Sequence, residues 1–285
     1  MNNTGAFLFQ KENIMRKKII RILISLVAFA SILIFGAYGF SSCVYKRAKK
    51  QLDFGLKETE ESRVYATIAD VNDTGVTDAS ENYRKTVTRL AYQDYTGDAV
   101  VTVNGNVPMF TDDEVTMTSF KEISDLDENG RTGMSIACLS KDMMPTLSRD
   151  FDLSEIKPSG FINRCYPELI EEDGWLFHRC HVLGYQLTGE TTNPLNLFTG
   201  TRFLNENGML WQENAVAQQL REVPGIHIMY RVTPVYRDDE LVCRGVLMEA
   251  FSVEDNGGFQ FCVYCFNVQP GIEIDYRTGE SKIGG

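Results

Sequence analysis

An uncharged run from Ile22 to Tyr45 constrains this chain of 285 residues more than any other feature. Its apolar part, Ile22 to Phe40, has 19 residues, which is about the length that one α-helix needs to cross a bilayer. A cleaved signal peptide usually has a shorter apolar core, of about 7–15 residues. We therefore expect a transmembrane anchor, or an uncleaved signal, at 22–45 behind a basic cytoplasmic segment at 1–21.

Basic residues flank the apolar run on both sides, so charge alone fixes its orientation poorly. Residues 1–50 hold nine basic residues and one acidic residue, whereas 51–285 hold 19 basic and 38 acidic residues. The long acidic part must lie on one side of the membrane, and we place it outside the cell. The expected protein is single-pass in the cell membrane, or secreted if the segment is cleaved. Phe40-Ser41-Ser42-Cys43 weakly resembles a lipoprotein cleavage box, which leaves lipidation as an alternative.

The acidity of the part beyond the anchor argues against a protein that binds nucleic acid by electrostatics alone, because such a protein neutralises many phosphates with cations. It leaves open an enzyme that binds phosphate at one local site with a metal ion. Residues 46–95 have sparse, aperiodic apolar residues, which is typical of a segment that buries little surface. We expect an acidic flexible stalk there, with at most a short helix at Tyr83–Tyr92, and a folded domain at 96–285.

The carboxyl third predicts an antiparallel meander of three strands. Runs rich in β-branched and aromatic residues, separated by polar turns, occupy Ile226–Tyr236, Leu241–Val253 and Phe259–Asn267. Between Met209 and Val223 the apolar residues recur at helical spacing. Strands and helices are therefore segregated along the chain, which indicates an α+β fold.

Candidate catalytic residues concentrate between His178 and Glu213. Two of the three histidines of the chain, His178 and His181, lie three residues apart. Such a pair could bind zinc, but a catalytic zinc site needs a third protein ligand, and the neighbouring sequence supplies none. Cys180 and His181 are poorly placed as a dyad, because adjacent residues of a strand point to opposite faces. The histidines could equally be polar groups of the surface or the core.

The side chains that follow this pair suit phosphodiester hydrolysis with one hard cation. A neutral imidazole takes a proton from water. An amide oxygen binds a Mg²⁺ ion that keeps most of its waters, and a guanidinium binds phosphate. The candidates are Arg179, His181, Asn196, Arg202 and Asn205.

His178-Arg179-Cys180-His181 and then Asn193-Pro194-Leu195-Asn196 resemble the DRGH motif and the metal-ligand asparagine of the DNA/RNA non-specific endonucleases. The likeness is greatest to the surface DNA-entry and secreted nucleases of Gram-positive bacteria, and it runs from about Val101 to Ser281. It implies a ββα-metal (His-Me finger) nuclease core, in which two strands and a helix surround one divalent ion. We expect this core within the α+β fold, with an antiparallel sheet and packed helices, preceded by the N-terminal transmembrane helix.

The resemblance also implies roles for single residues. His181 matches the general base, and Arg179 matches the arginine near the phosphate. Asn196 matches the asparagine that coordinates Mg²⁺, and Asn205 matches a second active-site asparagine, expected to bind substrate. Glu213 is the best match for the acidic residue that organises the water shell of the metal.

The chain departs from the family motif at two positions. His178 stands where the motif has Asp or Asn, and Cys180 stands where it has Gly. His178 is therefore a candidate modulator of local hydrogen bonding or of the pH dependence, while the base and the metal ligand remain. Arg202 is a further candidate for substrate binding.

These features predict a Mg²⁺-dependent endonuclease, with Mn²⁺ as a substitute, that hydrolyses DNA and RNA outside the cell. Its partners are nucleic acid as substrate and the membrane through the N-terminal helix. Two alternatives remain: a catalytically impaired surface protein of the same fold that binds nucleic acid, and a zinc hydrolase. Replacing His181 with Ala separates the first alternative from the enzyme, and the metal requirement separates the second.

Overall fold

A computed structural model describes residues 79–147 and 151–284 of the chain. The anchor expected at 22–45, the basic segment 1–21 and most of the expected stalk lie outside the described residues. Within the described ranges, no helix is both long enough and apolar enough to cross a membrane.

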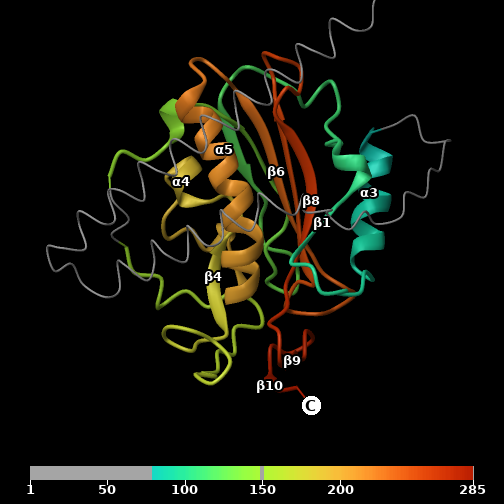
Figure 1. The fold of residues 1–285 in the computed structure, drawn as a ribbon, viewed down its shortest axis with the longest axis vertical. Coiled ribbons are helices and arrows are strands. Elements are labelled where there is room, and N and C mark those ends of the chain that lie inside the picture. The colour runs from blue at the N-terminus through green and yellow to red at the C-terminus, as the bar shows by residue number, and fades with distance from the viewer. Residues whose placement is uncertain (1–78, 148–150, 285) are drawn as a thin grey trace, which may run out of the picture. The chain divides into compact units, whose positions relative to one another are not determined.

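A six-stranded antiparallel sheet forms the centre of the described fold (Figure 1). Its strands lie in the order β1-β8-β7-β6-β3-β2. Their bounds are β1 Val100–Thr102, β2 Phe120–Ile123, β3 Ser135–Leu139, β6 Ile228–Val235, β7 Gly245–Ser252 and β8 Gln260–Phe266. Strands β6, β7 and β8 pair in register as an antiparallel meander, which confirms the strands that the β-branched runs predict.

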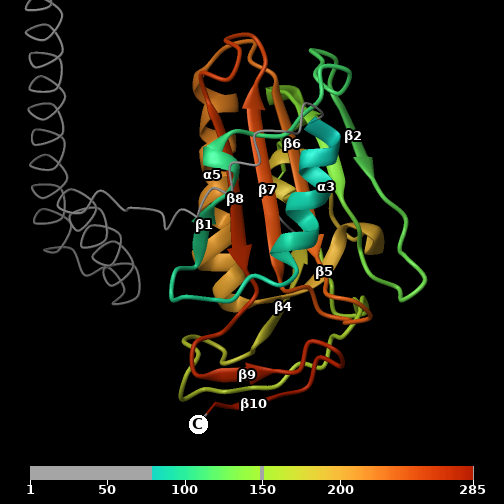
Figure 2. The same cartoon turned by 90° about the vertical axis from the view of Figure 1, so that its right-hand side faces the viewer.

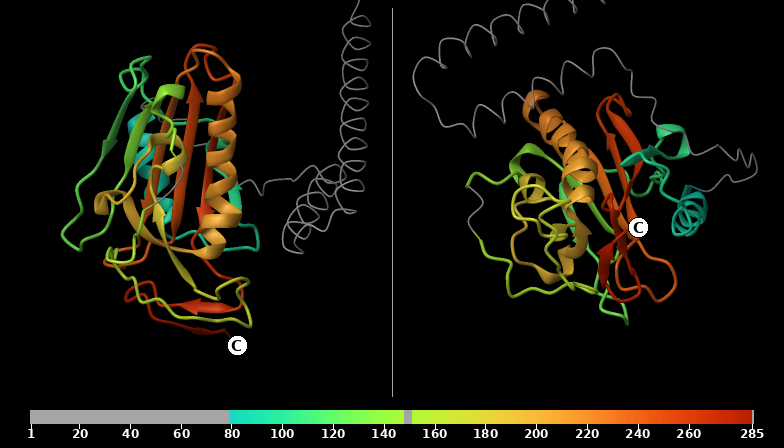
Figure 3. Two further views of the ribbon diagram at one scale, coloured as in Figure 1. Left: turned by 90° about the vertical axis from the view of Figure 1, so that its left-hand side faces the viewer. Right: turned by 60° about the horizontal axis from the view of Figure 1, so that its bottom comes forward.

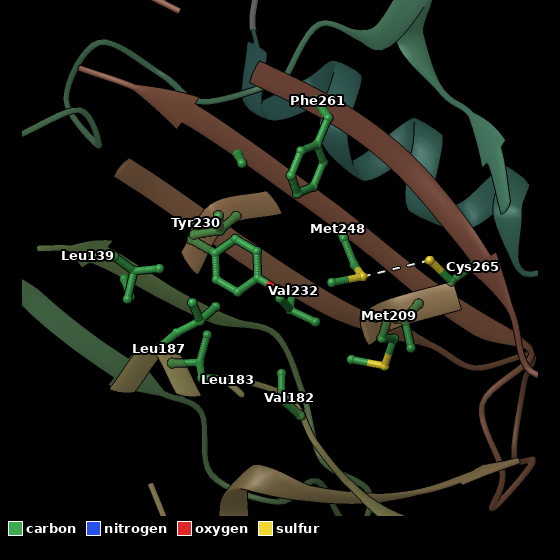
Figure 4. Packing of buried hydrophobic residues seen from close by; sticks show 14 of the residues in the cluster. Leu139, Val182, Leu183, Leu187, Met209, Tyr230, Val232, Met248, Phe261 and Cys265 are labelled. Carbon is green, nitrogen blue, oxygen red and sulfur yellow. Dashed lines mark hydrogen bonds between the residues drawn. The ribbon is translucent and has the colours of Figure 1, made fainter. Parts of the chain in front are cut away.

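Side chains of this sheet alternate between two cores, because successive residues of a strand point to opposite faces. On β8, Val263 and Cys265 belong to the core beneath helix α5 (Leu210–Glu222). Figure 4 shows this core, with the thiol of Cys265 3.7 Å from the sulfur of Met248. Tyr264, between the two β8 residues, joins the opposite core with Leu90. Both faces are therefore covered, α5 lying on one and helix α3 (Ala79–Leu90) on the other (Figure 2).

Helix α3 corrects the predicted stalk, which was expected to extend to residue 95. Leu90 is fully buried, and the hydroxyl of Tyr83 is hydrogen-bonded to that of Thr233 at 2.7 Å. The Tyr83 ring also covers the guanidinium of Arg231, 4.1 Å from the ring centroid. The predicted boundary at residue 96 is wrong, because Tyr83, Val87 and Leu90 form an apolar stripe that packs on the sheet.

One ion pair is buried under α3. The Nε of Arg231 donates to Glu249 at 2.7 Å, and the two residues are 2% and 0% exposed. Glu114 accepts a second bond from this guanidinium at 3.0 Å. The carboxylates compensate the arginine charge where water does not reach, which is the condition for a stable buried ion pair.

The histidine motif lies on a separate two-stranded sheet. Strand β4 (Phe177–His181) pairs antiparallel with β5 (Leu197–Thr201). The short helices α4 (Tyr185–Thr188) and η3 (Pro194–Asn196) connect the two strands. After β5 the chain enters a π-helical turn, η4 (Leu204–Met209), that continues into α5. Figure 3 shows the two strands on the side of the large sheet that helix α5 covers.

A hairpin and two short helices complete the described fold. A carboxyl-terminal hairpin pairs β9 (Ile272–Ile274) with β10 (Ser281–Ile283). The short helix η1 (Asn104–Asn106) follows β1, and η2 (Lys141–Met143) follows β3. The hairpin is tied to the motif side of the fold, since Tyr166 hydrogen-bonds to Ser281 at 2.8 Å and packs in one core with Phe177.

Candidate active site

A cavity of about 960 Å³ opens beside β4, α4 and the start of α5. Five of the residues that the sequence predicts for the site line it: His178, Arg179, His181, Asn205 and Glu213. The other two, Asn196 and Arg202, lie elsewhere. The lining of the cavity includes both polar and apolar side chains, so the cavity can receive both a charged group and an apolar surface.

His181 ends β4, and its ring is held at the cavity wall with only 8% of the residue exposed. Its Nε2 lies 2.8 Å from the backbone oxygen of Thr191. A carbonyl oxygen only accepts hydrogen bonds, so Nε2 carries the proton and Nδ1 is the basic nitrogen of the neutral ring. The ring of Phe151 packs edge-on against the imidazole, with 5.9 Å between centroids. This fixed tautomer is what a general base requires.

Arg179 is clamped in one plane at the same wall. Its guanidinium donates to the backbone oxygens of Ile156 and Ser154. The ring of Phe161 stacks beneath it, 4.3 Å from the guanidinium carbon. The direct contacts are to neutral carbonyls and a ring, while the Asp152 carboxylate acts on the charge through space, so the guanidinium can still attract an anion.

Asn205 lies in the π-helical turn η4, and His178 orients its amide. The Nδ2 of Asn205 donates to Nδ1 of His178 at 3.2 Å. The Oδ1 of the same amide accepts a weak bond from the thiol of Cys180 at 3.6 Å and has a second lone pair. The histidine that replaces the motif Asp thus still supplies a hydrogen-bond acceptor to a neighbouring site residue.

Glu213 faces the cavity from the first turn of α5. Gly184 lies directly against it, because a Cβ at that position would come within 2.7 Å of the carboxylate. Gln186 approaches the same carboxylate, its Nε2 lying 3.5 Å from Oε2. The segment that links Asn205 to Glu213 begins with a π-helical turn, a form that is frequent at functional sites.

Asn196 occupies a different place from the one predicted for a metal ligand. It is fully buried at the end of η3. Its Oδ1 accepts from the backbone N–H of Leu183 at 2.8 Å, and its Nδ2 donates to the Leu183 oxygen at 3.0 Å. Buried peptide groups require such partners, so the amide ties the segment after β4 to the start of β5. This geometry contradicts the predicted role of Asn196.

Arg202 also differs from its prediction as a substrate-binding residue. Its side chain is only 9% exposed and forms ion pairs with three carboxylates. Nη1 lies 3.0 Å from Glu172 and 2.9 Å from Glu206, and Nη2 binds Asp173. The guanidinium charge is therefore already compensated. The spacing of four residues between Arg202 and Glu206 was a sequence signal for this pairing.

Two important features of the cavity were not predicted from the sequence. The Thr191 carbonyl that fixes His181 is a backbone atom, so no residue type marks it. Trp175 lines the cavity with 44% of its surface exposed. The available signal for Trp175 was its rarity, because the chain has two tryptophans and this one follows the polar segment Glu171–Gly174.

The site offers hard oxygen donors for a divalent cation. The amide oxygen of Asn205 and the carboxylate of Glu213 are ligands of the kind that suits Mg²⁺ and Mn²⁺. Over residues 79–147 and 151–284, no group of three or more His, Cys, Asp or Glu side chains is arranged to hold a metal ion. The two oxygen donors fit a cation that keeps much of its water shell.

Residues 113–253 match the family model described as DNA/RNA non-specific endonuclease. This stretch contains β4, β5, η4 and α5, and with them every residue that lines the cavity. The match confirms the resemblance to the DNA/RNA non-specific endonucleases that the motifs indicate.

Two of the solved structures that resemble this chain are of one streptococcal protein. The structure of NucA from Streptococcus agalactiae with magnesium ion bound aligns with a TM-score of 0.60 and 22% identity, over 72% of this chain and 97% of that chain. The same protein with no metal bound aligns with a TM-score of 0.58 and 22% identity, over 74% and 99%. These alignments confirm the predicted α+β nuclease fold.

A deoxyribonuclease from Streptococcus dysgalactiae subsp. equisimilis is 31% identical over 108 residues. The match covers 36% of this chain and 32% of the relative, so the chain spans about a third of that protein's length.

Proposed function

We propose that this chain is an endonuclease that hydrolyses phosphodiester bonds of DNA and RNA with the help of Mg²⁺, for which Mn²⁺ substitutes. The match to the family model supports the reaction type, which is hydrolysis of phosphodiester bonds. The observation that carries the mechanism is the single cavity lined by His181, Arg179, Asn205 and Glu213, in which the Thr191 carbonyl makes Nδ1 the basic nitrogen of the imidazole.

His181 acts as the general base in this mechanism. Its Nδ1 takes a proton from the water that attacks phosphorus, while the Nε2–H bond to Thr191 holds the ring and stabilises the imidazolium that forms. Arg179 binds a phosphate oxygen through its clamped guanidinium and so orients the scissile bond. The bond between phosphorus and the 3′ oxygen breaks, which leaves a 5′-phosphate on one fragment, and the departing 3′ oxygen takes a proton from water to become a 3′-hydroxyl.

Asn205 and Glu213 are the residues that would hold the cation, replacing the predicted Asn196. When bound, Mg²⁺ neutralises the charge that develops on the phosphate and on the departing oxygen. His178 acts indirectly: by accepting from Nδ2 it keeps Oδ1 of Asn205 turned away from itself. The proposed contacts of this site are made to the phosphate and carry no sequence information, which fits low sequence specificity.

The proposal includes the location expected from the sequence. The apolar run at 22–45 would anchor the chain in the cell membrane with the nuclease domain outside, and it is the sequence alone that supports this part. Protease added to intact cells should remove the nuclease domain and spare a cytoplasmic marker. Protection of the domain in intact cells would contradict the location.

The experiment that tests the function is hydrolysis of plasmid DNA and of RNA in EDTA and after addition of Mg²⁺, Mn²⁺ or Zn²⁺. We expect Mg²⁺ or Mn²⁺ to restore activity and Asn205→Ala to raise the Mg²⁺ concentration needed for half-maximal rate. His227→Ala is the control for a substitution outside the cavity and should leave hydrolysis unchanged. This histidine is paired with Glu254 at 2.6 Å and does not line the cavity. A folded wild-type protein that degrades neither substrate with either cation would overturn the proposal.

A further inference from the structure

Trp175 is a large cavity residue to which the proposed mechanism gives no role. It is 44% exposed, and Leu210 beside the same cavity is 42% exposed. Single apolar residues on a surface are ordinary, but these two share a catalytic cavity with Phe161. An indole ring offers a wide apolar face and gains free energy when another flat ring covers it.

The loop that carries Trp175 is held rigidly. The carboxylate of Asp173 accepts from the Trp175 backbone N–H at 3.2 Å and is itself bound by Arg202. Gly174 adopts a φ of +75°, and its oxygen accepts from the N–H of Tyr166 at 2.7 Å. A rigidly mounted aromatic ring loses little conformational entropy when it binds a ligand. Arg202 therefore helps to fix this loop.

The chemistry around Trp175 suits a nucleotide whose base is not paired. Arg179 and Lys157 line the same cavity and supply positive charge for a phosphate. Trp175 and Leu210 supply the apolar surface that a base requires. Bases inside a duplex have both faces covered by their neighbours, whereas an unpaired base exposes a face that can stack on an aromatic ring.

We propose that Trp175 is a stacking platform for an unpaired base next to the phosphate that is cleaved. This inference rests on the proposed nuclease function and extends it to a substrate class, single-stranded or locally unpaired nucleic acid, which binds more tightly than duplex. Loss of one base–aromatic stack weakens binding by about 5- to 150-fold.

The two tryptophans of the chain allow a direct binding measurement. In the full chain carrying Trp211→Phe, Trp175 is the sole tryptophan, and its fluorescence reports contact with a base. A short thymidine strand is titrated in EDTA, so that binding is read without hydrolysis. We expect this strand to quench the fluorescence, and the same strand with abasic residues, or a blunt duplex, to quench it far less. Equal quenching by the abasic strand, or none by the thymidine strand, overturns the inference.

Hydrolysis in Mg²⁺ provides the second readout, with Trp175→Ala and the conservative Trp175→Phe in the same background. Trp175→Ala should raise KM for the thymidine strand by about 5- to 150-fold with little change in kcat. Trp175→Phe should keep most of the affinity, and neither change should alter KM for the abasic strand. Equal KM values for the Ala variant and its parent on the thymidine strand contradict the stacking role. If the parent hydrolyses nothing, the nuclease proposal fails, while the fluorescence titration still decides the stacking.

Discussion

The two asparagines of the site region provide the sharpest test of how the structure divides their roles. Asn196→Ala should destabilise the protein and leave the chemistry of the folded molecules intact. Asn205→Ala should change the stability little and impair the chemistry. The contrast follows from burial, since the Asn196 amide is fully enclosed and bonded twice to Leu183, whereas Asn205 is partly exposed and lines the cavity.

The size of the Asn196 effect follows from those two bonds. Removing the amide leaves the N–H and the C=O of Leu183 unsatisfied in a site that water does not reach, at about 1–3 kcal/mol for each group. The variant therefore loses about 2–6 kcal/mol of a total stability of about 5–15 kcal/mol. At about 2–4 °C per kcal/mol for a domain of this size, Tm falls by roughly 4–24 °C. Asn205→Ala removes the bond to His178, worth about 1 kcal/mol, and the weaker bond from the Cys180 thiol, so its Tm falls by only a few degrees.

Thermal unfolding followed by circular dichroism gives Tm, and hydrolysis over a range of Mg²⁺ concentrations gives the metal requirement. Below its lowered Tm, Asn196→Ala should need the same Mg²⁺ concentration as the wild type, and Asn205→Ala should need much more. A normal Tm together with a raised Mg²⁺ requirement in Asn196→Ala would refute the reasoning. It would restore the role that the motif alone predicts for Asn196.

Three further predictions use other parts of the structure. Gly184→Ala places a methyl group against the Glu213 carboxylate and should raise the Mg²⁺ concentration for half-maximal hydrolysis without a large change in Tm. Glu249→Gln weakens the buried ion pair with its arginine and should lower the free energy of unfolding, measured in urea, by as much as about 5 kcal/mol. Iodoacetamide at about pH 8 should label the exposed Cys165 first among the described thiols, because burial raises the pKa of Cys243 to about 12.

Each of these predictions has a clear contrary result. Unchanged metal dependence in Gly184→Ala would mean that the Glu213 carboxylate plays no part in holding the cation. Wild-type stability of Glu249→Gln would mean that the arginine charge is compensated without it. Labelling of Cys243 as fast as Cys165, mapped by mass spectrometry, would contradict the burial of that thiol.

The meander and helix α5 could be predicted because their signals are local. Runs of β-branched residues between polar turns define β6, β7 and β8 within a few residues of their ends, and period-3.6 apolar positions define α5. Helix α3 could not be predicted as part of the fold. Its partners Thr233 and Arg231 are about 150 residues away in the sequence. Its apolar residues Tyr83, Val87 and Leu90 follow directly after an acidic segment, so the pattern in the sequence is weak.

The candidate site also has residues whose place the sequence predicts and residues whose place it does not. His181 and Arg179 reach the cavity because a short motif on one strand fixes their directions. Asn196 and Asn205 could not be told apart, since both are asparagines near the motif and only tertiary packing decides which amide is buried. The position of Asn196 just before the fully buried strand β5 was a hint of its structural role. The support of His181 by a carbonyl oxygen has no sequence signal at all.

The most direct test of the central claim is chemical rescue of a variant that lacks the base. Replacing His181 with Gly should lower Mg²⁺-dependent hydrolysis of plasmid DNA by about 10²–10⁴-fold while the circular dichroism spectrum stays unchanged. Added imidazole, which supplies the missing basic nitrogen, should restore part of the rate in this variant and have no such effect on the wild type. Undiminished hydrolysis by the folded His181→Gly protein would contradict the account, because another group would then be taking the proton.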